Sequence, residues 1–132
     1  MEHLADLVPS TGSGPSRRER VLRSMAAAQA YEMTLFSTLV DGLGDIPGVS
    51  MCPAPAGRCP TVAFRVGDQL PGTTAELLGN EGICVFAGDY YASEYFDEMG
   101  LRSTGGAVRA SIYHYSTAEE VTRLLDAVKR CR

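Results

Sequence analysis

Three short motifs of one kind divide this chain, and each marks a place where a helix should begin. In each motif Ser or Thr stands three residues before Glu, at Ser16–Glu19, Thr73–Glu76 and Thr117–Glu120. In such a capping box the hydroxyl accepts the backbone N–H of the glutamate, whose carboxylate reaches back to the first residue. The motifs therefore predict a long helix over 17–44, a short one through Leu77 and Leu78, and a third from residue 118 onward.

Apolar segments that alternate with these helices predict short strands. Strands are expected near Val49 and over 61–66, 83–86 and 107–115, with a short helix over 2–8, a linker over 10–15 and a helical turn or two within 87–96. The predicted fold class is α/β (α+β). We expect a two-layer sandwich in which a small mixed or antiparallel sheet carries helices on one face. The domain prediction is a short helix and linker over 1–15, followed by a small α/β domain over 16–132.

The composition limits the classes of protein to which the chain can belong. With 132 residues, 45% hydrophobic and 21% charged, and a net charge of −4, it fits one folded domain. This balance excludes a disordered chain and a strongly basic nucleic-acid binder. The acidic start at Met1–Asp6 differs from a signal peptide, and no apolar run reaches the length of a membrane span. We therefore expect a cytoplasmic protein with no membrane or nucleic-acid partner.

Lysine and cysteine chemistry is sparse in this sequence. Lys129 is the only lysine, so any chemistry that needs an amine has one candidate. The four cysteines, Cys52, Cys59, Cys84 and Cys131, lack the C-x-x-C spacing of common zinc sites. Reduced thiols are the favoured interpretation. A metal or disulfide role for Cys52 and Cys59 is the alternative.

The segment 107–115 carries the most informative side chains. Alternation places Val108, Ala110 and Ile112 on one face and Arg109, Ser111 and Tyr113 on the other. The Arg109 guanidinium suits a bidentate grip on a carboxylate or phosphate. The competing interpretation is an exposed strand arginine paired with a surface acid.

Two further groups of side chains allow a functional and a structural interpretation. His114 falls on the apolar side of the same alternation, so a structural histidine is favoured over a ligand or a base. Tyr90, Tyr91 and Tyr95 follow an apolar strand and either line a pocket or pack against the core.

The run 106–121, G-A-V-R-A-S-I-Y-H-Y-S-T-A-E-E-V, resembles the C-terminal signature of class V aminotransferases. These enzymes include the cysteine desulfurases and desulfurase-like proteins, and their signature reads approximately V-R-x-S-x-x-H-Y-N-T-x-E-E-V. Ser116 stands in the place of the asparagine. Other segments agree in order with the family, namely 16–20, 43–49, 60–64 and 82–85.

The resemblance implies the small C-terminal domain of a fold-type I pyridoxal-phosphate enzyme, with residues 1–15 as the end of a large domain. The large domain carries the Schiff-base lysine and the cofactor, so the chain is expected to be inactive alone and to bind no cofactor by itself. The implied partners are the large domain or chain, an amino-acid substrate and further copies in a homo-oligomer. The implied activity is that of a transferase or lyase.

The resemblance also implies site residues. Arg109 would bind the substrate α-carboxylate, while Asp89, Tyr90 and Tyr91 would lie at the lip of the active site. No catalytic or metal-binding residue is expected in this chain. A tyrosine stands where desulfurases of this kind have their persulfide-forming cysteine, and Cys84 would be inert in a buried strand.

Two other functions remain open at this point. The chain would serve as a non-enzymatic module that self-associates through its open sheet face, or as a small regulatory domain that binds an amino acid. The presence of a large domain with the cofactor lysine would favour the enzyme over the self-associating module, and saturable amino-acid binding without any cofactor would favour the regulatory domain.

Overall fold

The order of elements agrees with the sequence prediction. The structure, a computed structural model, describes residues 2–9, 14 and 16–131. The elements are α1 (Glu2–Ala5), α2 (Arg17–Gly44), β1 (Val49–Met51), β2 (Thr61–Val66), α3 (Pro71–Asn80), β3 (Phe86–Gly88), α4 (Ser93–Glu98), a 3₁₀ turn (Arg102–Thr104), β4 (Ala107–Ser111) and α5 (Ala118–Arg130). Most of the predicted linker over 10–15 lies outside the described residues. Among the described helices, none combines the length and apolar character that a membrane span requires.

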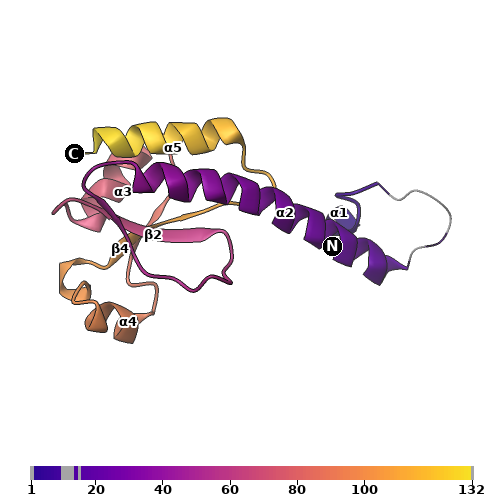
Figure 1. The fold of residues 1–132 in the computed structure, drawn as a ribbon, viewed down its shortest axis with the longest axis horizontal. Helices are drawn as coiled ribbons and strands as arrows, with labels where there is room; N and C mark the ends of the chain where they lie inside the picture. Colours follow the sequence, from indigo (N-terminus) through magenta and orange to yellow (C-terminus); the bar gives the residue numbers. More distant parts are fainter. Residues whose placement is uncertain (1, 10–13, 15, 132) are drawn as a thin grey trace.

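The four strands form one antiparallel sheet in the order β1-β2-β4-β3. In its register Ala63 of β2 lies opposite Arg109 of β4, which in turn lies opposite Phe86 of β3. Figure 1 shows α2 and α5 side by side along one face of the sheet, with α4 beyond the other face. The predicted α+β fold with a long N-terminal helix and a small sheet is therefore confirmed.

The core lies between the sheet and the helices α2 and α5. Alternate residues of β2 and β4 point into it, and the apolar sides of the helices meet them there. Its most deeply buried members are Val62, Phe64 and Val108 from the sheet, Leu39 and Leu43 from α2, and Val121 and Val128 from α5. Each such side chain contributes about 1.5–3 kcal/mol through removal from water. Because alternate residues of β2 and β4 point into this core, the residues between them lie on the opposite face of the sheet.

Two of the three capping boxes are confirmed and one is wrong. Ser16 and Thr117 cap α2 and α5 with both reciprocal hydrogen bonds. By contrast α3 begins at Pro71, before the predicted box, because proline at the first helical position has a suitable φ and lacks only an unpaired N–H. Thr74 is consequently inside the helix, where its buried hydroxyl donates to Gln69 Oε1 at 2.6 Å.

Two predicted strands have different bounds in the structure. The strand expected over 107–115 ends at Ser111, because the Tyr113 N–H donates to Ser116 Oγ at 3.1 Å in a turn. The strand expected over 83–86 is replaced by β3 at Phe86–Gly88. The initial helix is also shorter than predicted and ends at Ala5.

Candidate functional site

The face of the sheet away from α2 and α5 carries Arg109. The predicted alternation is confirmed, since Val108, Ala110 and Ile112 are 0–6% exposed while Arg109 and Ser111 are half-buried. We call this side the open face. It is formed by the half-buried residues of β2 and β4, by the exposed Phe86 of β3 and by the loop after β3.

Two aromatic rings frame the Arg109 guanidinium. Its central carbon lies 4.8 Å from the centroid of the Tyr90 ring and 5.3 Å from that of Phe86. Such cation–π contacts contribute about 0.5–2 kcal/mol, depending on exposure. Within the described part of the chain Arg109 forms no ion pair, so the structure does not bear out the surface-acid alternative. The guanidinium is held in place without a neutralising carboxylate.

Tyr90 fixes the loop that follows β3. Its hydroxyl donates to the carbonyl of Ala107, and the Phe86 carbonyl lies 3.1 Å from the same oxygen. Burial raises the pKa of the Tyr90 hydroxyl, and the nearby Arg109 charge opposes this rise. Tyr90 and Tyr91 adopt φ values of 51° and 62°, a region that costs non-glycine residues energy and is concentrated at functional sites.

Asp89 organises this loop. Its carboxylate accepts hydrogen bonds from the Tyr91 backbone N–H at 3.3 Å and from the Ser93 hydroxyl at 3.4 Å, and it lies 3.6 Å from Arg102 Nε. These contacts turn the chain so that Tyr90 lies against Arg109. The Tyr91 side chain instead extends fully into solvent. The structure therefore brings Tyr90 to Arg109, gives Asp89 an Arg102 partner and leaves Tyr91 outside this contact.

A close backbone approach holds the loop to β4. Gly106 has φ +71°, and a Cβ atom built on it would lie 2.1 Å from the carbonyl oxygen of Gly88. Only glycine permits both this conformation and this contact. Sequence reasoning missed the contact because it depends on the pairing of β3 with β4, which brings the end of β3 to the residue before β4.

Arg65 is a second half-buried arginine on the open face, and sequence reasoning also missed it. It follows Thr61 and Ala63 in the alternation of β2, and its Nη1 donates to the carbonyl of Gly106 at 2.6 Å. Beside it, burial raises the pKa of the Cys52 thiol, which the Arg65 charge opposes. The alternation within 61–66 could have placed Arg65 opposite the apolar face, although not beside Arg109.

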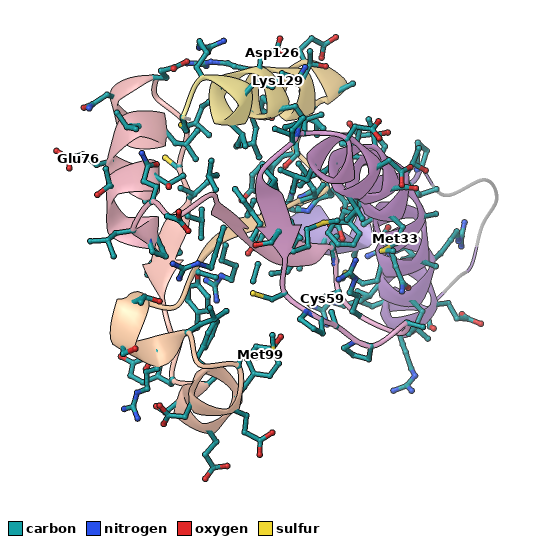
Figure 2. All side chains as sticks on the ribbon, turned by 60° about the vertical axis from the view of Figure 1, so that its left-hand side comes forward. Met33, Cys59, Glu76, Met99, Asp126 and Lys129 are labelled. Atoms are coloured by element: carbon teal, nitrogen blue, oxygen red, sulfur yellow. The ribbon has the colours of Figure 1, made fainter. Side chains whose placement is uncertain are left out.

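The remaining candidate residues lie outside this group. His114 Nδ1 is 4.0 Å from Glu32 Oε1 on α2. Lys129 forms an ion pair with Asp126 at 3.0 Å, and Figure 2 places both at the outer side of α5. Cys84 is exposed, so the prediction of an inert buried thiol is wrong, because β3 begins two residues later. The described residues hold no cluster of His, Cys, Asp or Glu suited to a metal ion.

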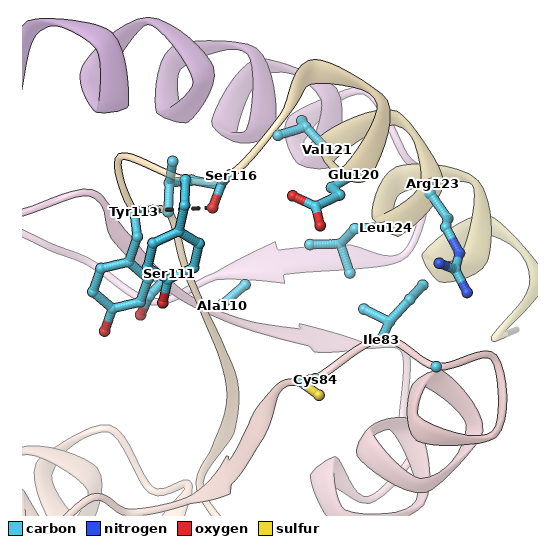
Figure 3. A pocket seen from close by; sticks show the side chains of 13 residues that line it. Ile83, Cys84, Ala110, Ser111, Tyr113, Ser116, Glu120, Val121, Arg123 and Leu124 are labelled. Carbon is cyan, nitrogen blue, oxygen red and sulfur yellow. Dashed lines mark hydrogen bonds between the residues drawn. The ribbon is translucent and has the colours of Figure 1, made fainter. Parts of the chain in front are cut away.

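A cavity of about 340 Å³ lies between the end of β4, the segment before β3 and the first turns of α5 (Figure 3). Several of its polar side chains are already engaged. Glu120 belongs to a capping box, Arg123 donates to the carbonyl of Glu81, and the Ser111 hydroxyl hydrogen-bonds to β2. None of the predicted site residues lines this cavity, so the open face is the better candidate site.

Known proteins resemble this chain over most of its length. A sequence model of the class V aminotransferases matches residues 22–124. An uncharacterized protein of Mycobacterium tuberculosis is 34% identical over 128 residues, which are 97% of this chain and 31% of that protein. A probable cysteine desulfurase of Mycolicibacterium paratuberculosis is 34% identical over 101 residues, which are 76% of this chain and 14% of that protein.

Solved structures of cysteine desulfurases share the fold. The CsdA enzyme of Escherichia coli superposes with a TM-score of 0.71 at 24% identity, over 91% of this chain and 31% of that one. The apo enzyme of Thermococcus onnurineus gives 0.76 at 23% identity, over 86% of this chain and 28% of that one. The chain spans about a third or less of the length of these proteins.

Proposed function

This chain belongs to the class V aminotransferase family, and from that premise we propose that it forms the small C-terminal domain of a pyridoxal-phosphate enzyme and binds the amino-acid substrate. The observation that carries the proposal is the Arg109 guanidinium. It is half-buried, framed by Phe86 and Tyr90, and without an ion pair among the described residues. A cation held in this way suits an anionic ligand.

Arg109 would bind the substrate α-carboxylate through two parallel N–H···O bonds. Hydrogen bonds of this charged kind contribute about 1.5–3 kcal/mol each. The rings of Phe86 and Tyr90 lie close to the guanidinium and restrict the space in which its planar fork can rotate. Tyr90 is itself fixed by its hydrogen bond to Ala107. The residues of this chain therefore bind and orient the substrate.

The described residues do not fit the Schiff-base role that pyridoxal phosphate requires. A Schiff-base lysine needs a desolvated or charge-perturbed setting. Lys129 is exposed, is paired with Asp126 and lies on α5, which covers the opposite face of the sheet from Arg109. We therefore assign the cofactor lysine to a large domain or partner chain.

The reaction class that we propose is a transferase or lyase reaction on an amino acid. In the resemblance described above, a tyrosine of the 90–91 pair stands where desulfurases carry their persulfide-forming cysteine. The loop after β3 contains no cysteine, and Cys84 precedes the strand. A persulfide route through this loop is therefore not part of the proposal.

The partner surface that we propose is the exposed aromatic part of the open face. Phe86 is 65% exposed and Tyr91 is completely exposed. Large apolar side chains in such positions favour contact with another surface. A large cofactor domain, or a second copy in a homo-oligomer, would cover them and close the site around Arg109.

The test is Arg109→Lys in the complete enzyme loaded with pyridoxal phosphate. Lysine keeps the charge but lacks the planar fork, so amino-acid binding should weaken at least about tenfold, which corresponds to 1.4 kcal/mol. Binding is followed by the absorbance change of the cofactor. Arg18→Lys, on the exposed first turn of α2, is the matched control and should change nothing. Unchanged affinity in the Arg109 variant would refute the proposal.

A further inference from the structure

Arg65 and Arg109 are diagonal neighbours on the open face. Ala63 lies opposite Arg109 in the antiparallel register, and Arg65 is two residues further along β2. Diagonal positions of this kind are about 7–8 Å apart and within reach of long side chains. Two guanidinium groups therefore share one side of two adjacent strands.

Neither of these charges is neutralised by a described residue. Arg102, Lys129 and Arg130 form ion pairs with carboxylates, whereas Arg65 and Arg109 form none with any residue that the structure describes. Among the described residues, the only hydrogen bond of the Arg65 guanidinium runs to the Gly106 carbonyl, which is uncharged. Two half-buried like charges repel each other and lose hydration, so a ligand with a single anionic group would leave one of the two guanidinium groups without a bound partner.

The nearby acidic and thiol groups do not supply the missing counter-charge. Asp89, on the adjoining loop, is engaged by Arg102 and by two hydrogen-bond donors. Burial raises the pKa of Cys52, so that its thiol stays protonated at neutral pH. The anion must therefore come from a ligand.

We propose that Arg65 binds a second acidic group of the substrate, so that the amino acid held by Arg109 is an amino dicarboxylate. The inference rests on the proposed function of Arg109. A guanidinium has five N–H donors, and the bond to Gly106 uses one of them. The remaining donors allow Arg65 to hold the side-chain carboxylate. Arg65 thus determines which amino acids the site prefers, while Arg109 holds the group that all of them share.

The test compares pairs of amino acids that differ in charge and hardly at all in shape. The affinities of L-aspartate and L-asparagine, and of L-glutamate and L-glutamine, are measured by calorimetry on the complete, cofactor-loaded enzyme. We expect at least one acidic member to bind at least tenfold more tightly than its amide. Arg65→Gln should remove this preference and leave amide binding within about twofold. Arg65→Lys should restore part of the preference, because it returns the charge.

The controls separate this inference from the proposed function. Arg18→Gln removes an exposed charge on α2 and should leave every affinity unchanged. The thermal transition of each variant reports whether loss of the Arg65–Gly106 hydrogen bond disturbs the fold. If Arg65→Gln does disturb it, Arg65→Lys serves as the second variant, because lysine retains a hydrogen-bond donor. If Arg109→Lys weakens all four amino acids while Arg65→Gln leaves the acidic preference intact, only this inference fails. Equal binding of acid and amide by the unaltered enzyme would also overturn it.

Discussion

Replacing Gly106 with alanine should destabilise the fold more than replacing any other described glycine at positive φ, because two separate energetic costs add at this position. The residue has φ +71°, and the added Cβ would lie 2.1 Å from the Gly88 carbonyl oxygen. A left-handed conformation costs an L-residue about 1–2 kcal/mol. Forcing an extra methyl group against a packed neighbour costs about 1–3 kcal/mol more.

Alanine substitutions at two other glycines distinguish the cost of the backbone conformation from the cost of the steric contact. Gly48 has φ +81° with nothing within 4 Å of its added Cβ, so Gly48→Ala should lose only about 1–2 kcal/mol. Gly79 lies in α3 with open space around it, so Gly79→Ala should gain about 0.4–1 kcal/mol by restricting the unfolded chain. Gly106→Ala should lose about 2–5 kcal/mol.

Thermal unfolding followed by circular dichroism measures all three variants. An unfolding entropy of about 2.1 cal/mol/K per residue gives a chain of 132 residues a shift of about 4 °C per kcal/mol. Gly106→Ala should therefore melt about 8–20 °C below the unaltered chain, and Gly48→Ala about 4–8 °C below it. If the two variants melt together, the loop relaxes without cost and the contact between Gly106 and Gly88 does not hold the site.

Two further predictions concern titration and reactivity. Because burial raises the pKa of Tyr90, its hydroxyl should ionise above the ordinary value of about 10. The stability that this shift provides is complete below pH 10 and is lost at higher pH. Tyr90→Phe should therefore remove one late-ionising group from a native phenolate absorbance titration and reduce the alkaline loss of stability; an unchanged titration would contradict this. Cys59 and Cys84 are exposed and should react with a thiol reagent before Cys52 and Cys131, whose thiol pKa values are raised by burial. Cys84→Ser should remove one fast-reacting thiol, and loss of a slow one instead would mean that Cys84 is buried.

The elements that the sequence predicts well are those set by neighbouring residues. Ser16 and Thr117 each meet their glutamate within one helical turn, so no distant part of the chain is needed to start α2 or α5. The motif at Thr73 has the same pattern, but Pro71 fixes an earlier start and Gln69 accepts the hydroxyl hydrogen of Thr74. A capping motif therefore determines where a helix begins only if no stronger helix-starting residue, such as Pro71 in α3, lies just before it.

The sequence predicts on which face of its own strand a site residue lies, but it does not predict which residues of other strands lie beside it. Alternation alone assigned Arg109 to the side opposite the core, and the burial of Val108 and Ala110 agrees with it. The position of Arg65 beside Arg109 depends on the register of β2 against β4, which lie more than 40 residues apart in the chain. The contact between Gly106 and Gly88 depends in the same way on tertiary pairing, here of β3 with β4. Alternation within a strand therefore determines the face of the sheet on which a side chain lies, whereas the pairing between strands determines which side chains lie next to it.

The contacts of Arg109 with two aromatic rings explain how a folded domain can position a cation and still leave it accessible to an anionic ligand. A carboxylate partner within the chain would neutralise the guanidinium, but it would also compete with every incoming anion. The rings of Phe86 and Tyr90 offer a weaker attraction, and no described residue accepts a hydrogen bond from the N–H groups of Arg109. Arg102 meanwhile engages Asp89, the acid that precedes Tyr90 in the chain. The ion pair of Asp89 with Arg102 thus supports the loop of Tyr90 and also engages the one acid of that loop that could compete with the anionic ligand that we propose for Arg109.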